Sequence, residues 1–337
     1  MSTTEYQTFS GFPMPRAPEA LVDRSRRPIV RTAKPGEKRF PFPVPDGWFV
    51  VAESRDLDPG QTIATHVFGN DVVIFRTASG EARMVDAYCA HLGAHLGVGG
   101  KVDGECIRCP FHGWTYDGES GRCTEIPYGD TKVIPSQARV RSYPVIERNH
   151  MIWAWHHGNG EPPFYDVPEV PEFYDDDWLP YEIREFDVAT CCQEMAENNV
   201  DFAHFMYVHG SDSIPDDEFE VRGTYKRTVG AGGQFVREGY GLGLGVLHMG
   251  DSALFLSSTT PIDDENVKVR WVFTARRSMG DDAADNMATG FSAGVSQDLP
   301  IWENKRYVAR PVVTKSEKKL LEQREWALQF YSNFTPE

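Results

Sequence analysis

Two short pairs of cysteine and histidine stand out in the first half of the chain. Cys89-x-His91 is followed, after seventeen residues, by Cys109-Pro-Phe-His112. Two thiolates and two imidazoles in this order match the ligands of a [2Fe–2S] cluster in which cysteines hold one iron and histidines hold the other. The long spacer fits a hairpin that returns one ligand loop beside the other.

A zinc site is the alternative for this stretch, because four nitrogen and sulfur ligands can also hold one tetrahedral zinc ion. Cys106 forms a C-x-x-C pair with Cys109, and His95 lies four residues past His91. A zinc ribbon, however, usually has two C-x-x-C pairs, or one such pair with two histidines, and Cys106 has no matching partner. We therefore favour the two-iron cluster and interpret Cys106 as a small strand residue.

A second set of possible metal ligands lies in the run Asp201-x-x-His204-x-x-x-x-His209-Gly210. Two histidines near a carboxylate indicate the 2-His-1-carboxylate face of non-haem Fe(II) oxygenases. Residues 190–208 predict a helix, on which Asp201 and His204 are about 60° apart but His204 and His209 about 140° apart. We therefore expect the helix to end or bulge near His209, where Gly210 follows. On their own, two histidines at this spacing are more often ordinary core residues.

Composition restricts the class of protein. The chain has 337 residues, 40% of them hydrophobic, and a net charge of −16, which allows two domains with sizeable cores and argues against nucleic acid or an anionic membrane as a partner. It contains no apolar run of 18 residues that would predict a membrane span, and it does not begin with a signal-peptide pattern. Six cysteines, two of them adjacent, are untypical of a secreted disulfide framework. These features predict a cytoplasmic protein.

The order of the segments predicts an N-terminal arm and two domains. Residues 1–42 are rich in proline, arginine and serine and show little periodicity. Residues 43–160 contain short strand candidates separated by turns and no helical period, which predicts a small all-β domain with the cluster ligands on two loop tips. A proline- and acid-rich linker occupies residues 158–178. Residues 161–337 combine the predicted helix at 190–208 with long strands and an amphipathic helix at 315–330. Strands are expected at Trp48–Ala52, Asp71–Arg76, Arg83–Asp86, Cys106–Cys109, Met151–Trp155, Thr224–Val229, Gln234–Arg237, Ala253–Ser258 and Val267–Thr274.

The segment Gly239–Gly245 reads GYGLGLG. It lacks the G-x-x-x-x-G-K-[ST] pattern, so it is not a phosphate-binding loop. We interpret it as a twisted strand or a loop against a ligand cavity.

The stretch around residues 89–112 closely resembles the Rieske proteins. Respiratory Rieske proteins carry two further cysteines, where this chain has Ala94 and Phe111, so the chain resembles the oxygenase and ferredoxin branch. With the D-x-x-H-x4-H run, it resembles the terminal oxygenase component of Rieske non-haem iron oxygenases. Within that family it resembles most the 3-ketosteroid 9α-hydroxylase oxygenases and the cholesterol 7-desaturases. The residues that carry this resemblance are Asp86–Cys89, Gly121–Tyr128, Asn199–Gly210, Asp298, Ile301, Trp302 and Lys305.

The resemblance implies a fold and a set of roles. The fold would be α+β, with a small Rieske domain and a larger helix-grip (START-like) catalytic domain built on an antiparallel sheet. Cys89, His91, Cys109 and His112 would bind the [2Fe–2S] cluster, and mononuclear Fe(II) would be held by His204, His209 and Asp298. In a homotrimer, an electron would pass from His112 through Asp201 to His204 of the next subunit. Asn198 matches a polar residue near the iron.

The function that the resemblance implies is O2-dependent hydroxylation of a steroid, most specifically of a 3-ketosteroid at C9. Electrons would come from a separate flavin/iron–sulfur reductase that uses NAD(P)H. Desaturation of a sterol is the alternative within the family. An electron-transfer protein without mononuclear iron, and more remotely a zinc-stabilised binding module, are the alternatives from other classes. A steroid cavity could be lined by Phe202, Phe205, Met206, Leu244, Leu247, Phe255 and Phe291, although most such residues are ordinary core residues.

Overall fold

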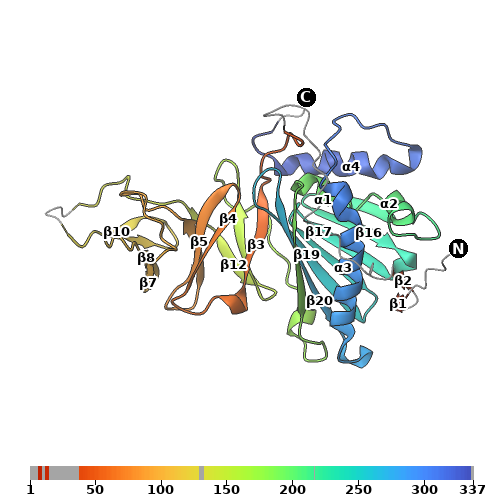
Figure 1. Cartoon of the computed structure of the whole chain (residues 1–337), viewed down its shortest axis with the longest axis horizontal. Helices are drawn as coiled ribbons and strands as arrows, with labels where there is room; N and C mark the ends of the chain where they lie inside the picture. Colours follow the sequence, from red (N-terminus) through yellow and green to blue (C-terminus); the bar gives the residue numbers. More distant parts are fainter. Residues whose placement is uncertain (1–6, 10–11, 15–37, 129–132, 216, 335–337) are drawn as a thin grey trace. The chain divides into compact units, whose positions relative to one another are not determined.

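The chain divides into two compact units. The structure, a computed structural model, describes residues 7–9, 12–14, 38–128, 133–215 and 217–334. Residues 46–169 form one unit, called here the cluster-loop unit, and residues 1–45 with 170–337 form the other, called the seven-stranded unit (Figure 1). The expected arm, residues 1–42, lies mostly outside the described residues.

The division differs from the boundaries expected at residues 42/43 and 160/161, and the packing explains why. Phe42 stacks on Tyr331 with ring centroids 5.0 Å apart, which ties the chain before residue 46 to the seven-stranded unit. The indole nitrogen of Trp48 donates a hydrogen bond of 2.8 Å to the carbonyl of Tyr165, which ties the first part of the linker to the cluster-loop unit.

The cluster-loop unit is built from three antiparallel sheets. Their strand orders are β12-β13-β3, β11-β6-β5-β4 and β10-β9-β8-β7. The strands are β3 (Gly47–Glu53), β4 (Thr62–Val67), β5 (Asn70–Arg76), β6 (Ala82–Asp86), β7 (Lys101–Asp103), β8 (Cys106–Arg108), β9 (Thr115–Asp117), β10 (Cys123–Glu125), β11 (Ser142–Tyr143), β12 (Val145–Arg148) and β13 (Met151–His156). Every residue of β13 is buried, as expected for the apolar central strand of its sheet.

The core of this unit continues beneath the two ligand loops. Leu96, Ile107 and Tyr116 are fully buried there, in one cluster with Cys89 and Cys109. The loops therefore rest on a packed base, which holds their side chains in defined rotamers.

The other unit is built around a seven-stranded antiparallel sheet with the order β14-β20-β19-β18-β17-β16-β15. Its strands are β14 (Glu182–Val188), β15 (Glu218–Arg222), β16 (Tyr225–Gly230), β17 (Phe235–Tyr240), β18 (Leu244–Met249), β19 (Ala253–Pro261) and β20 (Val267–Ala275); β1 (Gln7–Phe9) and β2 (Phe12–Met14) form a separate pair. The expected strands in this region are confirmed, and β18 shows that the glycine-rich segment is partly strand. The α+β class is also confirmed.

Helix α3 (Ala283–Trp302) packs on this sheet against β14 and β20 (Figure 1). No helix was expected at these residues from the sequence. Alanine, glycine and serine give α3 a weak hydrophobic period, yet these small residues let the helix approach the sheet closely. Its N-terminal half shares a buried cluster with β18–β20, which includes Ala284, Met287 and Phe273.

The single helix expected at 190–208 is interrupted, so that expectation was wrong. The structure has α1 (Cys192–Glu197) and α2 (Ala203–Tyr207), with residues 198–202 between them outside either helix. Asparagine, valine and aspartate there have low helix propensity, and Asn and Asp favour caps and turns. The C-terminal helix is confirmed as α4 (Lys318–Ala327), flanked by the 3-10 turns η6 (Lys315–Glu317) and η7 (Leu328–Phe330). None of the described helices is both long enough and apolar enough to cross a membrane.

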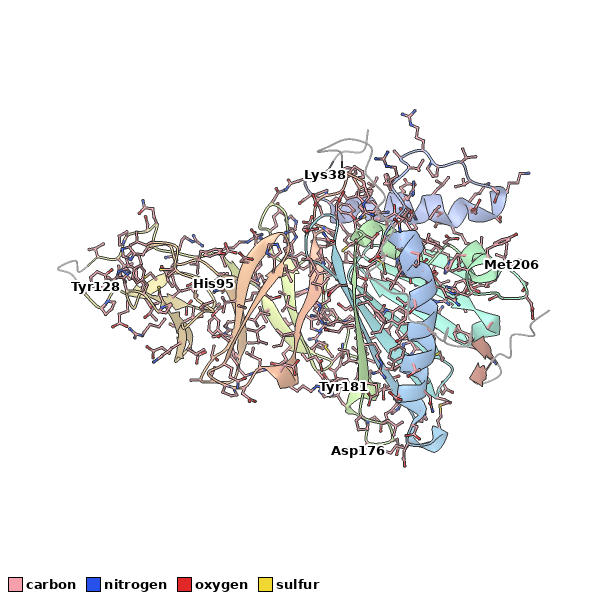
Figure 2. All side chains as sticks on the ribbon, viewed as in Figure 1. Lys38, His95, Tyr128, Asp176, Tyr181 and Met206 are labelled. Carbon is pink, nitrogen blue, oxygen red and sulfur yellow. The ribbon has the colours of Figure 1, made fainter. Side chains whose placement is uncertain are left out.

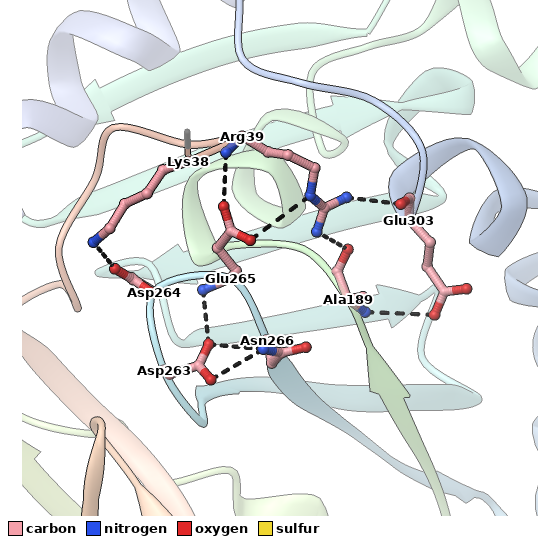
Figure 3. A network of polar contacts seen from close by, with 8 residues as sticks. All are labelled: Lys38, Arg39, Ala189, Asp263, Asp264, Glu265, Asn266 and Glu303. Atoms are coloured by element: carbon pink, nitrogen blue, oxygen red, sulfur yellow. Dashed lines mark hydrogen bonds and ion pairs between the residues drawn. The ribbon is translucent and has the colours of Figure 1, made fainter. Parts of the chain in front are cut away.

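A polar network ties Lys38 and Arg39 to the rest of the seven-stranded unit (Figure 3). The Arg39 guanidinium donates to the carbonyl of Glu303 (2.7 Å), just beyond α3, and to the carbonyl of Ala189 (2.9 Å), just beyond β14. Its backbone N–H donates to Glu265 in the β19–β20 turn (2.7 Å). Arg39 thus links the end of α3, the end of β14 and the β19–β20 turn at the edge of the sheet.

Candidate metal centres

The two predicted ligand loops of the cluster-loop unit have the same backbone form. The N–H of Gly93 donates to the carbonyl of Cys89 (2.9 Å), and the N–H of Gly113 donates to the carbonyl of Cys109 (3.2 Å). Each cysteine N–H in turn donates to a carbonyl five residues later, 2.9 Å in the first loop and 2.8 Å in the second. This repeated turn places two cysteines and two histidines at the loop tips, as the sequence predicts.

The side chains of these loops converge. The Cys89 and Cys109 thiols are in hydrogen-bond contact and both residues are only 3% exposed. The rings of His91 and His112 have centroids 4.7 Å apart. Backbone N–H groups of Phe111 and His112 point at the Cys109 sulfur. Two sulfurs and two ring nitrogens are thus brought together from two loops.

This donor set fits a [2Fe–2S] cluster. His91 Nδ1 is buried without a hydrogen-bond partner, although a buried ring nitrogen normally has one. A bound iron would satisfy it. Among the described residues, only His204, His209 and Asp298 bring three or more His, Cys, Asp or Glu ligand atoms within 4.8 Å of one another. The four loop residues are therefore too spread for a single tetrahedral zinc ion, whose sulfur ligands lie about 2.3 Å from the metal.

Aromatic residues that the sequence reading did not select support the loops. Trp114 stacks on His91 with centroids 4.6 Å apart and planes 5° apart. Its indole N–H donates to the hydroxyl of Tyr128 (3.0 Å), which is labelled in Figure 2. The Tyr116 hydroxyl lies 3.1 Å from Cys89 Sγ and accepts a 3.1 Å hydrogen bond from the Ala90 N–H. A cysteine bound to a cluster is a thiolate that can only accept, so the Tyr116 hydroxyl would then donate its proton to the Cys89 sulfur.

The second predicted set is assembled in the seven-stranded unit. His204, His209 and Asp298 each offer a ligand atom within 4.8 Å of the others. His209 Nε2 and Asp298 Oδ2 are 3.3 Å apart. Helix α2 ends at Tyr207, and Gly210 has a positive φ of 73°, so the expected end of the helix near His209 is confirmed. Asp298 is 6% exposed and comes from α3.

Each histidine is oriented through its other ring nitrogen. His209 Nδ1 lies 2.9 Å from Gln297 Oε1. His204 Nδ1 contacts the backbone carbonyl of Asp201. Both Nε2 atoms are left for a metal, and such outer contacts normally set the tautomer and the ring orientation of metal-binding histidines. The sequence reading missed Gln297, whose only signal is its position beside Asp298.

The electrostatics of the set differ between the two rings. Burial lowers the pKa of His204, against the opposing effect of Asp298. Burial would also lower the pKa of His209, but its contacts with Asp298 and Gln297 together outweigh burial and raise that pKa. Two half-buried imidazoles and one buried carboxylate form the donor set that non-haem Fe(II) sites use.

Two further predicted residues have other surroundings in the single chain. The Asp201 side chain is 48% exposed, and its carboxylate is 4.0 Å from His204 Nδ1, so its backbone carbonyl makes the closer contact. Asn198 caps α1 through its backbone N–H. Its neighbour Asn199 lines a cavity beside the sheet. The roles of Asp201 and Asn198 stay predictions.

Comparison with known proteins covers both units. The Rieske [2Fe-2S] domain family matches residues 47–144, and the 3-ketosteroid 9alpha-hydroxylase C-terminal domain family matches residues 154–331. Cholesterol 7-desaturase of Caenorhabditis elegans is 31% identical over 339 residues, which are 87% of this chain and 78% of that protein. The oxygenase component of 3-ketosteroid-9-alpha-monooxygenase from Rhodococcus rhodochrous is 27% identical over 90% of this chain and 86% of its own.

The fold is shared with solved structures. Dicamba monooxygenase bound to dicamba superposes with a TM-score of 0.66 at 18% identity, over 84% of this chain and 96% of that chain. The two matched families, the relatives and the cluster-loop geometry agree. The chain therefore belongs to the Rieske oxygenases that carry a 3-ketosteroid 9alpha-hydroxylase C-terminal domain, and it is an oxidoreductase with a Rieske [2Fe–2S] domain.

Proposed function

We propose that the chain is the oxygenase component of a two-component monooxygenase that hydroxylates a 3-ketosteroid, at C9. The observation that carries this proposal is the convergence of His204, His209 and the buried Asp298 inside the domain matched by the 3-ketosteroid 9alpha-hydroxylase family. The donor set and the matched domain point to the same chemistry independently.

The residues of the chain would do the following. Cys89, Cys109, His91 and His112 hold the [2Fe–2S] cluster, which stores an electron. His204, His209 and Asp298 hold Fe(II), which supplies O2 activation when bound. Three protein ligands leave coordination positions open for O2, and the protein contributes orientation of the substrate and exclusion of water.

An aromatic side chain beside the two histidines supports an apolar substrate. Phe205 lies against both rings, with centroids 4.4 Å from His204 and 5.7 Å from His209. Of the apolar residues expected to line a cavity, Leu244, Leu247 and Phe255 do so. Phe255 also packs edge-on against Phe291 of α3, with centroids 5.0 Å apart.

The partners follow from the relatives. The Rhodococcus proteins are named as oxygenase components, which implies a separate reductase. We propose that this reductase is an NAD(P)H-dependent flavin/iron–sulfur protein, that the chain assembles as a homotrimer in the cytoplasm, and that an electron passes from His112 to the neighbour's His204 through Asp201.

Desaturation of a sterol at C7 is the second candidate. The observation that favours it is the 31% identity to the nematode cholesterol 7-desaturase over most of the chain. Hydroxylation and desaturation share the same metal ligands, and which one occurs depends on the hydrogen that faces the iron.

A single turnover separates the candidates. The iron-loaded protein is reduced and exposed to O2 with androst-4-ene-3,17-dione or with cholesterol, and products are identified by mass spectrometry. One added oxygen on the ketosteroid supports the proposal, and loss of two hydrogens from cholesterol supports the second candidate. His204→Ala should abolish either product while the visible spectrum of the cluster persists. Absence of any product from wild type, with electron transfer by the cluster unchanged in His204→Ala, would support an electron carrier without mononuclear iron.

A further inference from the structure

Gly294 lies inside helix α3, close to the residues that could hold iron. It precedes Asp298 by four residues, and residues four apart on an α-helix differ by only about 40° around its axis, so the two lie on the same face. A glycine in a helix interior is less stable than an alanine there, because it loses more backbone freedom on folding. Its presence at this position therefore requires an explanation.

Neither backbone conformation nor packing requires a glycine at position 294. The residue is helical and is not one of the glycines with a positive φ. Packing does require a glycine at Gly121, where a Cβ would lie 2.1 Å from the carbonyl oxygen of Val140. At Gly294, leaving aside its chain neighbours and the helix backbone, a Cβ would have one described atom within 4 Å, Cε1 of His209 at 3.9 Å. That is an ordinary van der Waals contact, so the fold has room for an alanine.

The room left by the missing side chain adjoins the metal-facing edge of the His209 ring. Cε1 of that ring is bonded to Nε2, and Nε2 lies 3.3 Å from Oδ2 of Asp298. The other ring nitrogen, Nδ1, lies 2.9 Å from Oε1 of Gln297. Three neighbouring positions of α3 thus surround one imidazole, and two of them supply polar groups while Gly294 supplies none. A molecule lying against Gly294 would be next to the atoms that can bind a metal.

An aromatic ring lies on the other side of Gly294 along the same face of α3. Phe291 precedes it by three residues, and its ring packs against Phe255, with centroids 5.0 Å apart, and against Phe273, with centroids 5.7 Å apart. Phe291 and Asp298 are seven residues apart, which is about 10 Å along the helix axis. A stretch of backbone without a side chain, between an aromatic ring and a set of metal ligands, fits a flat apolar ring system better than a polar ligand.

We propose that Gly294 is a specificity-determining residue, whose missing side chain lets one face of a fused-ring substrate lie directly against the backbone of α3 beside His209 and Asp298. Close approach of a ligand to the backbone is one of the established reasons for a glycine. This inference rests on the proposed function, because it assumes a substrate that reacts at these metal ligands. Stability and substrate binding are then expected to change in opposite directions when a side chain is added.

The test compares wild type, Gly294→Ala and Gly294→Val with the control Thr289→Ala. Thr289 is an exposed residue of the same helix, and alanine raises the helix propensity at either position. Urea unfolding midpoints are measured for each protein, together with dissociation constants of the iron-loaded holoenzyme for the steroid that wild type converts, androst-4-ene-3,17-dione or cholesterol. Bound iron is measured in the same samples.

Gly294→Ala and the control should both unfold at a higher urea concentration than wild type. Of these two, only Gly294→Ala should bind the steroid more weakly, by about tenfold, and Gly294→Val should weaken binding by up to about a hundredfold, the range for extra methyl groups in a filled site. Bound iron should be the same in all four proteins, because an added Cβ meets His209 only at van der Waals distance.

The inference and the proposed function fail in different ways. Unchanged steroid binding by both Gly294 variants would overturn the inference, while steroid turnover by wild type kept the proposed function intact. Weaker binding together with loss of iron would also overturn the inference, because position 294 would then support the metal ligands and not the substrate. Absence of steroid turnover by wild type would overturn the proposed function, and the inference with it. If Gly294→Val does not fold, as judged by circular dichroism, Gly294→Ala decides alone.

Discussion

Replacing Lys226 by methionine should make the stability of the protein less dependent on pH. Burial lowers the pKa of Lys226 from 10.5 to about 7. Because an unfolded lysine keeps its usual pKa, the unfolded state binds one more proton than the folded state between pH 7 and pH 10.5. The free energy of unfolding of wild type therefore rises with pH in this window, by up to about 1.4 kcal/mol per pH unit from this group.

The size of the effect follows from the shift. Below pH 7 the folded protein must carry a buried ammonium, at a cost of up to about 5 kcal/mol for a shift of about 3.5 units. Over two pH units, from 7.5 to 9.5, wild type should gain about 2–3 kcal/mol relative to Lys226→Met. Methionine fills a similar volume but lacks the charge, so at pH 7.5 the variant should be the more stable protein.

The assay is urea unfolding of both proteins at pH 7.5, 8.5 and 9.5, followed by tryptophan fluorescence. The visible colour of the cluster reports unfolding of the other unit separately. Groups such as Cys191, whose pKa is also raised by burial, are common to both proteins and cancel in the difference. A difference in stability that does not change with pH, or that grows in favour of the variant as pH rises, would refute the reasoning.

Three further predictions concern the two metal centres and the core. Tyr116→Phe removes the O–H donor 3.1 Å from Cys89 Sγ. It should lower the reduction potential of the cluster by on the order of 40 mV, the equivalent of one hydrogen bond of about 1 kcal/mol. An unchanged midpoint in a potentiometric titration would contradict this. Asp298→Asn should lose mononuclear iron on dialysis but keep the cluster. The control Asp285→Asn changes an exposed residue of the same helix that pairs with Arg184, and it should keep both the iron and the cluster. Iron retained by Asp298→Asn would exclude Asp298 as a ligand. Arg324→Met leaves the buried Glu197 carboxylate without its cation and should lower the free energy of unfolding by about 3–5 kcal/mol in the same urea titration. The control Arg222→Met breaks an exposed ion pair with Glu220 and should lower it by less than about 1 kcal/mol.

Much of the cluster site was predictable because its determinants are local. C-x-H and C-x-x-H each set the geometry of one short loop, and the hairpin between them brings the loops together. The hydrogen bond from Tyr116 to Cys89 was not predictable in the same way. It depends on strand β9 passing beneath the first loop, which residue types alone do not specify.

The iron site was predictable only in part. His204, His209 and the end of the helix at Gly210 follow from local spacing, although the break at residues 198–202 was missed. Asp298 was assigned through the family resemblance. Its burial depends on α3, a helix whose small residues give little hydrophobic periodicity and which is stabilised mainly by the sheet it covers.

Lys226 shows most clearly what only the tertiary structure decided. In the sequence it is one polar residue of a strand, and such residues usually face water. Its environment is created by segments far apart in the chain: the end of α1, Gln323 of α4, and Gly239 of β17. The sequence by itself determined most of the strands, the C-terminal helix and the local ligand motifs, because these depend on neighbouring residues. Burial, charge state and the cavity were decided by packing, because each depends on what distant segments place around a side chain.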